Sequence, residues 1–89
     1  MNRDAAETIA LKALAFIAGD DEGLRRFMAL SGLEPGSLRE SAGEPETLAG
    51  VLDFLLGDEP RLKRFCDDAG LAPETPARAR AALPGAIRE

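Results

Sequence analysis

The sequence predicts an all-α fold, a compact bundle of five to six short helices built as two tandem three-helix units with a pseudo-twofold relation. Composition is the first reason. The 89 residues include 16 Ala and 13 Leu but only three Ile, one Val and three Thr, whereas strands favour β-branched and aromatic residues. The second reason is an internal repeat, because residues 13–37 closely resemble residues 51–75. A repeat of this length is typical of a duplicated helical unit.

The repeat aligns apolar, turn and capping residues alike. All four aromatic residues of the chain are Phe, and all of them fall on matched positions. The matched pairs are Leu14/Leu52, Phe16/Phe54, Gly19/Gly57, Asp20/Asp58, Leu24/Leu62, Arg26/Arg64, Phe27/Phe65, Gly32/Gly70, Leu33/Leu71 and Pro35/Pro73. This pattern is strong evidence for architecture and very little for chemistry.

Helices over Asp4–Ala18 and Pro45–Leu56 are expected at the centre of the bundle. Both are apolar around most of their circumference, which is typical of a helix that is covered on several sides. Their narrow polar stripes fall on the same repeat positions, Thr8, Lys12 and Ala15 in the first and Glu46, Gly50 and Asp53 in the second. Asp4 and Glu7 form a candidate N-terminal capping box for the first of these helices.

The helices that follow each central helix have one apolar face. The first starts after the N-cap residue Asp20 and ends at Gly32, and the second spans Glu59–Ala69 with Asp58 as cap. Their predicted core faces are Leu24, Phe27, Met28 and Ser31, and Leu62, Phe65, Cys66 and Ala69. Gly19 is expected to end the preceding helix in the left-handed conformation.

Two shorter helices complete the units. One is predicted over Pro35–Ala42, because Pro favours the first turn of a helix. The other starts with Thr75 as N-cap and Pro76 as first residue and extends to about Leu83. The tail 84–89 is expected to fray, and residues 1–89 form one domain.

Composition limits the possible functions. The chain has a net charge of −5, no His and one Cys, which excludes an intramolecular disulfide, a thiolate–imidazole pair and a His/Cys zinc site. We predict no catalytic residue, no cofactor, no metal and no small-molecule ligand. The first apolar run is interrupted by Lys12 and is too short to span a bilayer, so we expect a cytoplasmic protein without membrane partners.

Three groups of residues remain as candidates for chemistry. Cys66 could be a reactive thiol, but its place on an apolar helix face indicates a buried structural residue. The acidic runs at residues 20–22 and 58–59 could bind a metal, but capping of the next helix explains them fully. Ser31, Ser37 and Ser41 lack an activating His, and no nucleophile-elbow motif surrounds them.

Basic residues suggest a nucleic-acid contact as an alternative function. Arg25 and Arg26 in one helix, with Arg61, Lys63 and Arg64 in its repeat, could contact phosphates. The acidic net charge and the lack of a basic recognition helix argue against this, because nucleic-acid-binding domains carry a basic patch. A solvated surface with weak ion pairs explains these residues as well.

The positions at which the repeats differ are the best candidates for a partner surface. Ala15, Ala29 and Leu30 align with Asp53, Asp67 and Asp68, so the first unit is apolar where the second is acidic. Either other helices cover these positions, as we expect for the third helix of that unit, or they form an exposed apolar patch. With the adjacent Arg26, they constitute the predicted partner surface.

The runs LAFIAGDDEGLRRFMALSGLEPGSLRE and GVLDFLLGDEPRLKRFCDDAGL resemble a family of small bacterial proteins classed only as a domain of unknown function. The resemblance extends from about Leu11 to Arg80, and LDFLLGDE is its most specific part. It implies a compact, cytosolic helical protein and assigns no site residues.

The sequence therefore favours a non-enzymatic interaction or adaptor domain that binds a protein partner or a second copy of itself. A nucleic-acid-associated accessory protein is the alternative, and a small-molecule enzyme comes third.

Overall fold

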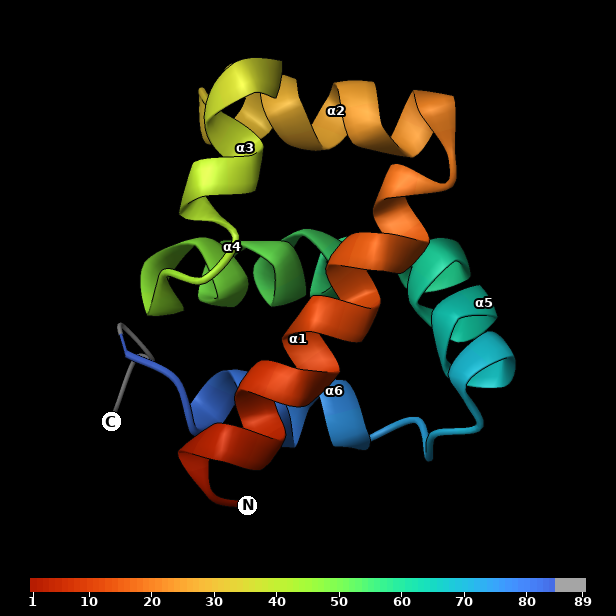
Figure 1. The fold of residues 1–89 in the computed structure, drawn as a ribbon. Helices are drawn as coiled ribbons and strands as arrows, with labels where there is room; N and C mark the ends of the chain where they lie inside the picture. The colour runs from red at the N-terminus through yellow and green to blue at the C-terminus, as the bar shows by residue number, and fades with distance from the viewer. Residues whose placement is uncertain (85–89) are drawn as a thin grey trace.

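The structure is a computed structural model that describes residues 1–84, apart from the side chains of Pro35 and Arg39. These residues form helices and no strand, which confirms the all-α prediction (Figure 1). The helices are α1 (Arg3–Ala18), α2 (Asp21–Ser31), α3 (Pro35–Ser41), α4 (Pro45–Leu56), α5 (Glu59–Ala69) and α6 (Thr75–Ala81). Residues 85–89, in the predicted frayed tail, lie outside the described residues.

Helices α1 and α4 pack against each other at the centre of the molecule, as predicted (Figure 1). Ala6, Ala10 and Ala13 of α1 are completely buried, and their small side chains allow close approach of the neighbouring helices. Leu52 and Leu55 of α4 are also completely buried. Burial of each such leucine contributes about 1.5–3 kcal/mol.

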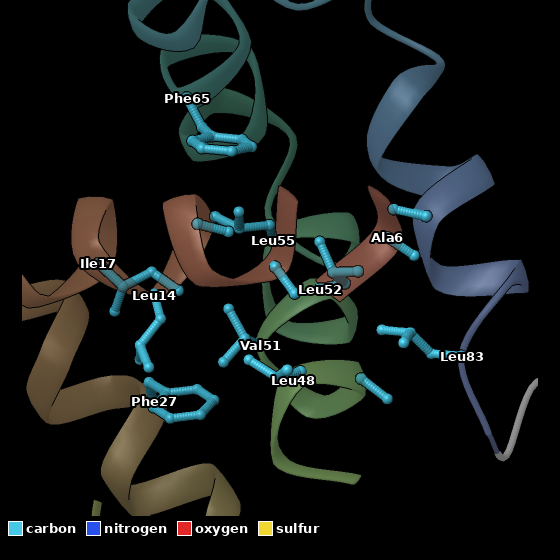
Figure 2. Close-up of a cluster of buried hydrophobic side chains, with 14 of the residues drawn as sticks. Ala6, Leu14, Ile17, Phe27, Leu48, Val51, Leu52, Leu55, Phe65 and Leu83 are labelled. Atoms are coloured by element: carbon cyan, nitrogen blue, oxygen red, sulfur yellow. The ribbon is translucent and has the colours of Figure 1, made fainter. Parts of the chain in front are cut away.

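The buried side chains form one continuous core. Figure 2 shows residues of α4 between side chains of α1, with Phe27 at one end and Phe65 at the other. The predicted polar stripes face outward, because Thr8, Lys12 and Ala15 are exposed in α1, as are Glu46 and Asp53 in α4.

Helix α6 closes the core from the other side. It packs against both α1 and α4, and Pro76 and Ala79 are buried in this contact. The helix ends at Ala81 rather than at Leu83, but Leu83 is still buried in the core (Figure 2). Thr75 is the first helical residue and Glu74 the N-cap, one residue earlier than predicted.

An aromatic ring of α2 and one of α5 each pack against the central helix of the other repeat. Phe16 of α1 packs against Phe65 of α5 with ring centroids 5.5 Å apart. The repeat-equivalent pair, Phe54 of α4 and Phe27 of α2, has a centroid distance of 5.7 Å. Each unit therefore supplies an aromatic ring to the other, which joins the two units into one domain.

Helix α3 lies at the edge of the molecule and makes few contacts with the other helices (Figure 1). Leu38 is only partly buried. Since α6 lies across α1 and α4 and α3 does not, the third helices of the two units have different environments. The predicted pseudo-twofold relation of the complete units is not confirmed.

Two predictions about the ends of α1 are corrected. Gly19 ends α1 at φ −78°, an ordinary helical value, because α2 follows immediately; only Gly32 and Gly70 adopt positive φ among the described residues. Asn2, and not Asp4, caps α1 by accepting a hydrogen bond from the Ala5 N–H at 2.8 Å.

Ser31 is exposed and is not part of the core face of α2. Its hydroxyl donates to the Met28 carbonyl oxygen and accepts from the Leu33 N–H, both at 3.3 Å. The residue therefore stabilises the end of the helix. Helix α3 ends at Ser41, one residue before the predicted end.

Candidate interaction site

A groove of about 750 Å³ runs along the outer side of α5. The segment after the helix, which turns back toward α6, forms its second wall (Figure 1). Its lining is mostly apolar, with charged side chains at the margin. The lining residues, which we call the α5 groove, are Glu59, Pro60, Leu62, Lys63, Cys66, Asp67, Leu71 and Pro73.

The floor of the α5 groove follows from the spacing of residues on the helix. Leu62 and Cys66 are one turn apart and therefore lie on the same side of α5. Gly70 ends the helix at φ 68°, and the Leu71 N–H then donates to the Cys66 carbonyl oxygen at 2.9 Å. This C-terminal stop folds Leu71 back beside the helix.

Cys66 is a buried thiol, as the sequence predicted, with 5% of its surface exposed. Burial raises its pKa, and the carboxylates of Asp67 and Glu74 raise it further. Because the thiolate is the nucleophilic form, these effects suppress reactivity at neutral pH. The thiol therefore acts as part of an apolar surface.

Arg61 corrects the prediction that it belongs to a solvated basic surface. Only 4% of it is exposed. Its guanidinium donates to Asp58 Oδ2 at 2.6 Å and to Asp20 Oδ2 at 3.3 Å, and its Cζ lies 5.5 Å from the Phe54 ring centroid. Arg61 therefore joins α5 to the start of α2.

Gly23 makes room for this buried guanidinium. A Cβ atom at Gly23 would lie 2.9 Å from Asp20 Oδ2 and 3.2 Å from Arg61 Nε. In the aligned repeats Gly23 and Arg61 occupy equivalent positions. The pairing of a missing side chain with a long one was the available signal that these positions meet, and the sequence reasoning missed it.

Asp20 is the carboxylate most affected by this cluster. Partial burial opposes its ionisation, but the polar backbone at Gly23 and the charge of the Arg61 guanidinium outweigh burial and lower its pKa. Glu22 Oε1 lies 3.9 Å from Arg61 Nη2 as a further partner. Carboxylates therefore surround the guanidinium, which is buried between α5 and α2, although Arg61 Nε has no hydrogen-bond partner among the described residues.

A side-chain capping bond is present in one of the two acidic runs and absent in the other. Asp58 accepts a hydrogen bond from the Arg61 N–H at 3.3 Å at the start of α5. Asp20 occupies the N-cap position of α2 but makes no side-chain capping bond. Its carboxylate pairs with Arg61 instead.

The predicted partner surface is exposed. Leu30 has 75% of its surface accessible, and Ala15, Ala29 and Arg26 are exposed as well. The expectation that another helix covers the apolar positions is wrong, because α3 lies at the edge of the molecule and leaves them accessible. Ala15 is on α1, whereas Ala29, Leu30 and Arg26 are on α2.

The basic residues of the alternative hypothesis do not converge. Arg25 and Arg26 lie on α2 and are exposed, and Lys63 and Arg64 lie on α5 and are exposed. The two helices run in different directions from the corner where Arg61 meets Asp20 (Figure 1). No continuous basic strip is formed from them.

A smaller hollow of about 300 Å³ lies between α4 and α6. Arg80 Nε donates to Asp53 Oδ1 at 2.7 Å across it. Asp53 is the carboxylate that replaces Ala15 in the second repeat, and its role is to pair with α6. Both residues of this ion pair therefore line the hollow.

Comparisons with known proteins agree with the sequence resemblance. A family described as protein of unknown function (DUF3572) matches residues 3–86. No curated protein and no solved structure matches the chain. Within the described part of the chain, no helix combines the length and apolar character required to cross a bilayer.

Proposed function

The chain belongs to the DUF3572 family of proteins of unknown function, and we propose that it is a non-enzymatic protein-interaction domain that binds a segment of a partner in the α5 groove. The observation that carries the proposal is the groove itself. It has an apolar floor of Leu62, Cys66 and Leu71 and a volume of about 750 Å³. Binding sites of this size commonly bury apolar groups and use a few polar groups for orientation.

The construction of the groove supports a binding role. Its main wall is a regular helix, which holds Leu62 and Cys66 at a constant spacing. Preorganised surfaces lose little conformational entropy on association. Phe65, the residue directly before Cys66, is buried in the core and anchors the helix.

The chemistry of the groove supports a non-enzymatic role. Its thiol has a raised pKa, and the carboxylate with the lowered pKa, Asp20, is paired with Arg61 outside the groove lining. Active sites usually place perturbed acids, bases or nucleophiles in a cleft. The groove supplies apolar area, and the perturbation of its Cys66 thiol disfavours the reactive thiolate instead of favouring it.

A phage-displayed peptide library selected on the wild-type protein tests this function. We expect enriched peptides that, in NMR titrations of ¹⁵N-labelled protein, shift the amide signals of residues 59–73. Leu62→Gln and Leu71→Gln should each weaken binding at least fivefold, since each removes apolar contact area. Leu30→Gln, on the other exposed surface, is the matched control and should change binding less than twofold.

Circular dichroism verifies that each variant is folded before binding is compared. If both groove variants unfold, the shift map of the wild-type protein decides the result on its own. Absence of enriched peptides would reject the proposal. Shifts centred on α2, with loss of binding in Leu30→Gln, would reject the α5 groove.

The surface around Leu30 is the second candidate, because its apolar side chain is 75% exposed. A homodimer through Leu30, Ala29 and Arg26 would use it, with Ala15 on the neighbouring helix. Sedimentation equilibrium tests this directly. A concentration-dependent dimer that is lost in Leu30→Gln would support it, and a monomer at all concentrations would reject it.

A further inference from the structure

We infer that the occupant of the α5 groove is a cationic amphipathic helix of a partner protein, with apolar side chains on one face and Lys or Arg beside them. This inference rests on the proposed function and specifies the chemistry of the partner.

The charges at the margin of the groove favour a basic partner. The lining residues include two carboxylates, Glu59 and Asp67, and one cation, Lys63. All three are exposed, and in the part of the chain that the structure describes none of them forms an ion pair. Two carboxylates are therefore available to cationic groups of a partner.

The floor of the groove experiences the same negative field. Glu74, on the segment that follows Pro73, acts together with Asp67 on the Cys66 thiol, and both raise its pKa. Among the described residues, no cation has a comparable effect on this thiol. The groove therefore combines apolar area with a negative potential from both of its walls.

The other basic residue in this part of α5 does not line the groove. Arg61 lies on α5 between Pro60 and Leu62, but its guanidinium is buried against Asp20 and Asp58. It therefore serves the contact with α2 and leaves the groove acidic. With a net charge of −5, the whole chain adds long-range attraction for a cation.

The backbone around the groove indicates that the partner is helical. The interior residues of α5 use their N–H and C=O groups within the helix, and Pro60 and Pro73 have no N–H to donate. An extended peptide would find no strand edge to pair with here, whereas a helix satisfies its own backbone groups. A helix can also place apolar side chains at i, i+3 and i+7 against Leu62, Cys66 and Leu71.

Two synthetic peptides of about 14 residues test the inference. Both carry Leu at i, i+3, i+4 and i+7 of a helical pattern, and the remaining positions are mainly Lys in one and mainly Glu in the other. ¹⁵N NMR titration with the wild-type protein should show the Lys peptide binding at least tenfold more tightly than the Glu peptide. The shifted signals should centre on residues 59–73.

Charge variants at exposed positions locate the effect. Asp67→Lys should weaken binding of the Lys peptide about fivefold, and Lys63→Glu should strengthen it about threefold, in line with the energies of exposed ion pairs. Asp21→Lys makes the same charge change on α2 and should alter binding less than twofold. Raising the salt from 0.1 to 0.5 M should weaken binding of the Lys peptide.

The possible outcomes separate the two proposals. Equal or tighter binding of the Glu peptide in the groove would overturn the cationic partner while supporting the groove as a binding site. No binding of either peptide, when selected phage peptides do bind, would overturn this inference alone. Equal effects of Asp67→Lys and Asp21→Lys would show that only net charge matters and would also overturn it.

Discussion

The two repeat units end in helices that serve the fold in different ways. In the second unit, α6 packs across both central helices and contributes buried residues to the core. In the first unit, α3 lies at the edge of the molecule with Leu38 only partly buried. The repeat defines two similar helix pairs, but a single third helix, α6, covers the central helix of each pair.

The two units also differ in the residues through which they contact each other. Gly23 in the first unit and Arg61 in the second align in the repeat, and the glycine gives the buried guanidinium the space it needs. Two identical residues there would either clash or leave a gap. The difference teaches that a duplicated helical unit becomes a single domain by diverging at its contact points.

Leu83→Ala should produce the largest difference between the units. Leu83 is 3% exposed beside α6, and removal of a buried leucine side chain costs about 2–5 kcal/mol of unfolding free energy. Leu38→Ala, in α3, should cost about 1 kcal/mol or less, because Leu38 is only partly buried. Urea unfolding followed by circular dichroism measures both. Equal losses would contradict the unequal roles of α3 and α6.

Arg61→Ala should lower the free energy of unfolding by about 2–3 kcal/mol, because it removes a buried cation and leaves carboxylates without their partner. Arg64→Ala is the matched control, since Arg64 lies on the same helix and is exposed. It should change stability by less than about 0.5 kcal/mol. Urea midpoints compare the two variants. A neutral Arg61→Ala would mean that the cluster does not stabilise the contact between the units.

Gly23→Ala should destabilise the protein by about 1–2 kcal/mol, since the added methyl group meets Asp20 and Arg61 at less than an ordinary contact distance. Gly50→Ala makes the same change inside α4, where no described atom outside the local helix backbone lies within 4 Å of the new Cβ. It should stabilise the helix by about 0.5–1 kcal/mol. Thermal unfolding should therefore shift in opposite directions for the two variants. A shift in the same direction would refute the close approach at Gly23.

Lowering the pH should weaken the contact between the units less than any of the substitutions above. The pKa of Asp20 lies below its ordinary value of 3.8, so its ionised form stabilises the folded state at higher pH. This contribution is lost as the pH falls below 3.8 through the lower folded-state pKa. Asp20→Asn should therefore reduce the acid-induced loss of stability, measured by urea unfolding at stepwise lower pH. An unchanged acid limb would contradict the role of the carboxylate.

Local patterns predicted most of the helices but only part of the site. Apolar periodicity and Gly or Pro stops gave α4 and α5 their bounds, and the repeat identified Phe16, Phe27, Phe54 and Phe65 as packed residues. These signals depend on neighbours along the chain, which a sequence contains directly.

Contacts between segments that lie far apart in the sequence cannot be predicted from such local patterns. The α5 groove depends on how residues 70–74 fold back beside the helix. The sequence alone indicates a surface position for Arg61, because most arginines are exposed. Leu30 was correctly singled out as a position where the units differ, but its exposure depends on where α3 lies. The repeat alignment could have paired Gly23 with Arg61, and it is the one missed signal that the sequence contained.

The placement of α6 has a consequence for biosynthesis. Among the described helices, α1 leaves the ribosome before the others, yet its buried surfaces are covered by α4 and by α6, the last of these helices. The first 43 residues therefore have no complete core of their own, and native packing must wait until the second unit has been translated. During that interval the apolar sides of α1 are open to chaperones and to other nascent chains.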